Sequence, residues 1–168
     1  MSNSTYVLDD KLLVSAGARF LHYIIDLLAF FVILILIGAV IGVLSALLDV
    51  TALSDWMNGL GDLGWNLIAI IVSLIYYIAM EGLLGRTLGK YITGSIVVDE
   101  NGQKPDFGTI VKRSFCRLIP FDALTFLGGS RGWHDSISGT YVVSKKALDE
   151  EVKSFHEFNL IGVQEVNQ

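Results

Sequence analysis

The sequence of 168 residues contains few charged residues, few prolines and a single cysteine. Charged side chains make up 17% of the chain and hydrophobic residues 52%, whereas charged residues make up roughly 25% of a typical soluble domain. The lone Cys116 excludes an intramolecular disulfide and a metal site with several thiolate ligands. The net charge of -5 argues against a basic surface for nucleic acid. This composition is typical of a membrane protein.

Charge is entirely missing from two long segments, residues 27–48 and 63–80. As helices, these 22 and 18 residues would reach about 33 Å and about 27 Å, close to the thickness of the hydrocarbon core. Trp65 marks one end of the second segment, and such aromatic side chains prefer the membrane interface. We therefore predict membrane-spanning helices over residues 24–48 and 63–81. A cleavable signal peptide, the alternative for the first segment, does not fit its length or the acidic residues around it.

Basic residues are absent between the two predicted spans. Residues 49–62 carry three aspartates, whereas Lys11 and Arg19 precede the first span and the other ten basic residues follow the second. Cytoplasmic segments of membrane proteins carry the excess of Lys and Arg. This distribution therefore places the loop outside and both termini in the cytoplasm.

Small residues recur at every fourth position along the first span. Gly38, Gly42 and Ala46 would form one stripe on the helix surface. In lipid, helices associate chiefly through van der Waals contact across such grooves. The stripe therefore either packs the intramolecular hairpin or serves association into a homo-oligomer or with another membrane protein.

Charged residues gather where the two predicted spans reach the cytoplasmic side. Asp26 and Glu81 lie at similar distances from the outer ends of their spans, and Arg19 and His22 precede Asp26 by two turns and one turn. Arg86 follows shortly after Glu81. This layer is either an anchor that fixes helix depth or a site for a proton or a monovalent cation, lined by the carboxylates. Two helices cannot enclose a path alone, so transport would require an oligomer or a partner.

The segment after the second span combines a glycine-rich turn with two short strands. Residues 85–90 superficially resemble a phosphate loop, but three residues rather than four separate the glycines, and Tyr91 follows the lysine. We expect the glycines instead to allow a tight turn at the membrane surface. Residues 95–98 and 140–143 are rich in β-branched side chains, which predicts two strands that pair in a small cytoplasmic sheet.

The residues between these strands, 107–119, show the spacing of an amphipathic helix. The basic edge formed by Lys112, Arg113 and Arg117 is expected to face the anionic lipid of the inner leaflet. The hydrophobic stretch that follows is too short to cross the bilayer, so residues 107–129 are predicted to form an amphipathic or re-entrant helical segment. The predicted fold is thus an all-α membrane protein, a transmembrane helical hairpin with this segment and a small cytoplasmic β element.

The sequence contains no recognisable catalytic or metal-binding motif. A His-Asp dipeptide occurs at His134 and Asp135, but the other histidines, His22 and His156, have no second cluster of ligands around them. Nucleophile elbows, Cys-His arrangements and dinucleotide fingerprints are missing. We therefore expect no enzyme activity, no metal and no cofactor.

Three motifs follow one another along most of the chain. They are Arg19 with Asp26 at the first span, the turn Gly85-x-Thr87-x-Gly89-Lys90, and Trp133-His134-Asp135 leading to Gly139-Thr140-x-Val142-Val143. Together they resemble the RDD family of small bacterial membrane proteins, over residues 16–143. The sequence departs from the common pattern at Ser136, where a basic residue is frequent, and in its short third hydrophobic segment.

The resemblance implies a multi-pass protein of the bacterial inner (plasma) membrane with cytoplasmic termini. We divide the chain accordingly into a cytoplasmic N-terminal segment (1–15), an RDD-like membrane domain (16–144) and a cytoplasmic tail (145–168). The resemblance also implies a link to transport of ions or small solutes, with some relatives acting as subunits of membrane assemblies. A non-transporting subunit or scaffold of a membrane complex is therefore the alternative function.

The resemblance further assigns the one Arg and two Asp of the family name to Arg19, Asp26 and Asp135. A half-buried guanidinium is best neutralised by carboxylates. We therefore expect Asp135 to reach the inner interface and to share Arg19 with Asp26. The resulting cluster is either a clamp that fixes the fold or a titrating or gating element.

Overall fold

The computed structural model describes residues 6–48, 51–128 and 131–166. The chain is mostly helical, with two long apolar helices and a small antiparallel sheet, which confirms the coarse fold predicted from the sequence. In chain order the elements are η1 (Asp10–Leu12), α1 (Ala16–Leu47), α2 (Ala52–Gly59), α3 (Gly61–Leu84), α4 (Leu88–Ile92), β1 (Ser95–Val98), α5 (Phe107–Cys116), η2 (Asp122–Gly128), α6 (Trp133–Ser138), β2 (Tyr141–Ser144) and α7 (Lys145–Val166).

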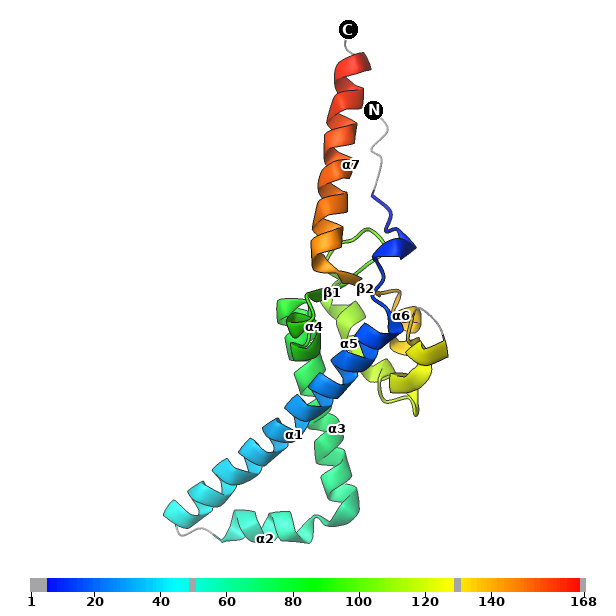
Figure 1. Ribbon diagram of the computed structural model, residues 1–168. Coiled ribbons are helices and arrows are strands. Elements are labelled where there is room, and N and C mark those ends of the chain that lie inside the picture. The colour runs from blue at the N-terminus through cyan, green and yellow to red at the C-terminus, as the bar shows by residue number, and fades with distance from the viewer. Residues whose placement is uncertain (1–5, 49–50, 129–130, 167–168) are drawn as a thin grey trace.

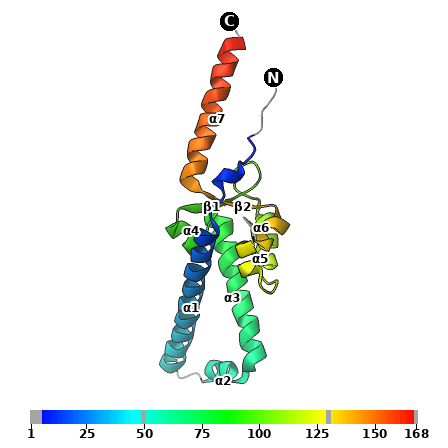
Figure 2. The same ribbon diagram turned by 45° about the vertical axis from the view of Figure 1, so that its right-hand side comes forward.

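The helices α1 and α3 form an open fork (Figure 1). They lie close together near the sheet and separate away from it, where α2 joins their far ends (Figures 1 and 2). Both are long and apolar enough to cross a bilayer, and the most apolar stretch of 18 residues in α1 contains no buried residue. A helix of a soluble protein buries its apolar stripe against a core. The exposed apolar surface of the fork therefore fits a lipid environment.

The small-residue stripe of α1 does not pack against α3. A Cβ atom added at Gly38 or Gly42 would meet nothing within 4 Å outside its own turn of helix, and Ala46 is exposed. The helix α1 instead packs chiefly on α4, and α3 packs chiefly on α5. The interpretation in which the stripe packs the intramolecular hairpin is therefore wrong, because contacts at the base of the fork set the helix positions and leave the stripe open.

The sheet lies at the base of the fork and pairs β1 with β2 in antiparallel register (Figure 1). Successive side chains of a strand point to opposite faces. On one face Val97 belongs to a small core with Ile110 of α5, and on the other Val98 shares a core with Leu12 of η1. Both predicted strands are confirmed, although the second begins one residue later than predicted. The sheet thereby holds the start of the chain and α5 together at the base of the fork.

The predicted amphipathic helix is present as α5, but its buried side combines Ile110 with Arg113. Arg113 is completely buried, whereas Phe115 is 53% exposed. The Arg117 side chain also turns inward, to an ion pair with Glu81 at 3.0 Å, and Lys112 alone of the three basic residues is exposed. The prediction that Arg113 and Arg117 face lipid is therefore wrong, because carboxylates on α3 and α6 attract both guanidinium groups into the protein.

The chain continues through η2 to α6, and its tail forms α7. In the described ranges, no third helix is both long enough and apolar enough to span a bilayer. Residue 129, the predicted end of the short hydrophobic segment, lies outside the described residues. So do residues 1–5 and 167–168 of the two terminal parts. The helix α7 extends from the sheet on the side opposite the fork (Figure 2).

Candidate functional site

A cluster of buried charged side chains lies at the base of the fork, where α1 and α3 meet the other helices. It draws on five helices and the residue that caps α5, so segments far apart in the sequence converge here. We call it the charge cluster, and it consists of Arg19 (α1), Glu81 (α3), Lys90 (α4), Arg113 (α5), Arg117 (the cap of α5) and Asp135 (α6).

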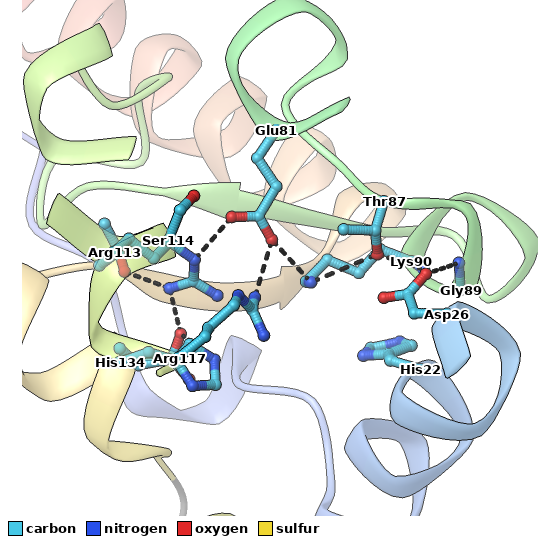
Figure 3. A network of polar contacts seen from close by, with 12 residues as sticks. His22, Asp26, Glu81, Thr87, Gly89, Lys90, Arg113, Ser114, Arg117 and His134 are labelled. Carbon is cyan, nitrogen blue, oxygen red and sulfur yellow. Dashed lines mark hydrogen bonds and ion pairs between the residues drawn. The ribbon is translucent and has the colours of Figure 1, made fainter. Parts of the chain in front are cut away.

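Glu81 accepts hydrogen bonds from three cations (Figure 3). Its Oε1 atom lies 3.0 Å from Lys90 Nζ and 3.0 Å from Arg117 Nη2, and its Oε2 atom lies 2.9 Å from Arg113 Nε. Glu81 is completely buried. A buried carboxylate is tolerated only when cations and donors replace its lost water, so these three contacts hold α3, α4 and α5 together.

Asp135 is the second carboxylate of the charge cluster. Arg19 Nη1 donates to its Oδ2 atom and Arg113 Nη1 donates to its Oδ1 atom. Arg113 Nη1 also donates to the Thr140 hydroxyl. Burial alone would raise the pKa of the Asp135 carboxyl, but the adjacent Arg113 and Arg19 outweigh burial and hold it well below its usual value. Asp135 therefore stays ionised and ties α1 to α5 and α6.

Asp26 lies near the charge cluster but has different partners. Its Oδ1 atom accepts from the Tyr76 hydroxyl at 3.0 Å and from the backbone N–H of Gly89 at 2.8 Å. In the part of the chain that the structure describes, it forms no ion pair with Arg19 or any other cation. The expectation that Arg19 is shared between Asp135 and Asp26 is therefore wrong, because Tyr76 and the first turn of α4 already supply donors to Asp26.

The turn between α3 and α4 brings Lys90 and Gly89 to this site. Gly85 ends α3 with a left-handed φ of 69°, a conformation that glycine adopts without strain. The Thr87 side chain caps α4. A Cβ atom at Gly89 would lie 2.5 Å from the carbonyl oxygen of His22. Glycine at this position therefore lets α4 pack directly on the backbone of α1.

A buried His-Asp pair lies beside the charge cluster. His134 Nδ1 is 2.6 Å from Asp122 Oδ2, and the backbone N–H of His134 donates to Asp122 Oδ1 at 2.8 Å. Burial, followed by the charges of Arg117 and Arg113, lowers the pKa of His134 to about 4. His134 is therefore neutral at pH 7, and its Nδ1–H donates to Asp122.

A small cavity of about 40 Å³ opens between these groups. One water molecule needs roughly 10–15 Å³ of such space, so the cavity has room for a few water molecules or a small ion. In the described ranges, no group of three His, Cys, Asp or Glu residues could hold a metal ion. The charged and titratable side chains that line the cavity are Arg19, His22, Tyr23, Asp26, Tyr77, Lys90, Arg117 and His134.

The remaining predicted site residues lie outside these contacts. The Arg86 guanidinium stacks over the Tyr91 ring, 4.4 Å from its centroid, and does not reach Glu81. His22 Nε2 lies 2.6 Å from the Thr93 hydroxyl. The predictions thus placed Arg86 wrongly as a partner of the acidic layer.

Sequence reasoning missed that Arg113 and Arg117 are the partners of Glu81. The sequence did contain a signal. Arg113 and Arg117 are four residues apart and therefore lie on the same side of a helix, where both can contact one buried carboxylate. Asp122 appeared only as an interruption of a hydrophobic stretch. No local pattern joins it to His134, twelve residues later.

Comparison with known proteins identifies similar sequences but no similar structure. The sequence profile described as "RDD family" matches residues 13–145. Over 87 residues the chain is 36% identical to the "Uncharacterized protein YxaI" of Bacillus subtilis (strain 168), a match that covers 47% of this chain and 57% of that protein. The match therefore spans little more than half the length of this relative. No solved structure matches.

Proposed function

Because the chain belongs to the RDD family, we propose that it is a multi-pass protein of the bacterial inner membrane that moves ions or small solutes across the bilayer without covalent catalysis. The observation that carries this proposal is the cavity of about 40 Å³ at the base of the fork, lined by charged side chains. Ionisable residues within membrane-spanning helices are costly, and they are typical of ion pathways.

The orientation that we propose places the charge cluster on the cytoplasmic side. The loop between the spans carries aspartates and no basic residue, which favours its location outside the cell. The cavity would then open near the cytoplasmic surface of the membrane. Ions would enter it from the cytoplasm and continue between the fork and its neighbours.

The path must be completed by other helices. The two apolar helices separate from each other away from the base (Figure 1), and two helices do not enclose a pore. The exposed stripe of Gly38 and Gly42 on α1 permits close approach of another helix. We propose that a second copy of this chain or another membrane protein packs there.

The test is ion flux in liposomes that contain only the purified full-length protein. Wild-type protein is expected to carry flux, and Asp26→Asn is expected to change its rate at least about ten-fold, equivalent to about 1.4 kcal/mol in the barrier. Loss of the carboxylate slows a cation or a proton and speeds an anion. Asp62→Asn, which removes an exposed carboxylate at the start of α3, is the matched control and should leave the rate unchanged.

A second function is favoured by the far part of the fork. An apolar cavity of about 160 Å³ lies between α1, α2 and α3, lined in part by Gly38, Trp56 and Trp65. A scaffold or non-transporting subunit would use this opening to hold a helix of another membrane protein. Absence of flux from the isolated protein, together with stoichiometric co-purification of a partner after mild detergent extraction, would contradict transport and favour this function.

A further inference from the structure

The charge cluster contains more cations than its ion pairs neutralise. Its four basic side chains form ion pairs with only two carboxylates in the described ranges, Glu81 and Asp135. Of the nearby acids, Asp26 is held by Tyr76 and Gly89, and Asp122 is held by His134. Asp26 and Asp122 thus accept from uncharged donors, and within the charge cluster itself four cations share two carboxylates.

Arg19 has one unused edge of its guanidinium group. The residue is 5% exposed, and its Nη1 atom donates to Asp135. Its Nε and Nη2 atoms are buried and have no hydrogen-bond partner among the residues that the structure describes. These two N–H groups lie parallel on one edge of the planar group and match the two oxygens of a carboxylate or phosphate. Buried donors left unpaired cost free energy, so this edge requires an acceptor.

The cavity of about 40 Å³ beside Arg19 is lined by more cations than carboxylates. Arg19, Lys90 and Arg117 line it, against one carboxylate, that of Asp26. Arg117 Nε is a further buried donor without a partner in the described part of the chain. The carboxylate of Glu81, which the sequence offered as a cation ligand, already accepts from three cations. These features favour an anion over a proton or a monovalent cation.

We propose that this cavity binds an oxyanion, a carboxylate or phosphate group, with the free edge of Arg19 as its bidentate donor. Lys90 and Arg117 add positive charge around the same space. The volume limits the bound group to a small anion or to the charged end of a larger molecule, such as the phosphate of an anionic lipid. The site binds this anion whether or not the protein moves it across the membrane. That the anion is also the transported ion rests on the proposed function.

The test is calorimetric titration of the full-length protein in a maltoside detergent, which carries neither charge nor phosphate. The probes are inorganic phosphate and a short-chain phosphatidylglycerol, each at constant ionic strength. We expect saturable binding of at least one probe by the wild-type protein. Arg19→Lys retains the positive charge but not the two parallel donors, and should weaken binding about ten-fold, the loss expected for one hydrogen bond to a charged group.

Arg86→Lys is the matched control, because Arg86 stacks on Tyr91 outside the charge cluster, and its binding should equal that of wild type. Tighter binding of inorganic phosphate identifies a free anion, and tighter binding of phosphatidylglycerol identifies a lipid headgroup. Binding of neither probe, or equal binding by wild type and Arg19→Lys, overturns the proposal. If Arg19→Lys does not fold, Arg117→Lys provides the same comparison through its own unpaired donor.

The outcomes for binding and for transport are independent. Arg19-dependent binding without flux in liposomes would retain the anion site and reject the transport function. Flux without saturable binding of either probe would retain transport and reject the anion site.

Discussion

The far part of the fork exposes large apolar side chains, whereas its base buries charged ones. Along α1 and α3, large apolar residues such as Ile35 and Ile75 are 69% and 62% exposed. At the base, Glu81, Arg113 and Asp135 have no exposed surface. In a soluble protein large apolar side chains are buried and charged side chains are exposed. This reversal is expected for a chain whose surroundings are lipid.

The difference indicates where the chain holds itself together. Apolar side chains in lipid gain nothing from contacting one another rather than acyl chains, so α1 and α3 are free to separate. Charged side chains at the base lack water and must find partners within the protein. The ion pairs at the base therefore fix the arrangement of the helices, whereas the far part of the fork depends on what surrounds it.

Removing the central carboxylate should break the base and have the largest effect. Glu81→Gln retains the size of the side chain but leaves Lys90, Arg113 and Arg117 without the charge that they share. Removal of one partner from a buried ion pair typically costs about 3–5 kcal/mol, and we expect a loss of this size in the free energy of unfolding. Denaturant unfolding in detergent measures it.

The matched control for this change is Glu100→Gln, which removes an exposed glutamate and should unfold like the wild type. Equal stability of Glu81→Gln and Glu100→Gln would show that the ion pairs at the base do not fix the fold.

A pH titration should have the next largest effect at the base. The pKa of His134 is about 4 in the folded protein and 6.5 for an ordinary histidine, so between these values the unfolded chain binds one proton more. The contribution of neutral His134 to the free energy of unfolding is therefore fully present above about pH 6.5. It is lost as the pH falls toward 4, by up to about 1.4 kcal/mol per pH unit.

Unfolding measured across this pH range checks the prediction. His134→Gln should show a smaller slope than wild type, and His156→Gln, which alters an exposed histidine of α7, should retain the full slope. An unchanged slope in His134→Gln would assign the pH dependence to other groups.

The sequence predicts the fork better than the base. Missing charges mark the two spans, and β-branched residues mark the two strands, because both signals are local. Two of the three partners of Glu81, Arg113 and Arg117, lie 32 and 36 residues away in the sequence, where no spacing rule operates. Periodicity identified the apolar and basic residues of α5 but not that Ile110 and Arg113 share its buried side. The inward position of Arg113 depends on its acidic partners from α3 and α6, which no local pattern reveals.

Gly42→Leu is expected to have the smallest effect on folding. It tests the far part of the fork through association of the protein with other helices. Because a Cβ atom there meets nothing within 4 Å, the free energy of unfolding should change by no more than about 0.5 kcal/mol. A leucine would nevertheless keep another helix from close approach, so association of the protein in detergent, measured by light scattering, should weaken. Val40→Leu alters a position that is 56% exposed outside the stripe, and it should associate like the wild type. Unchanged association of Gly42→Leu would mean that the stripe faces lipid, and the helices that complete the path would then have to contact another surface of the fork.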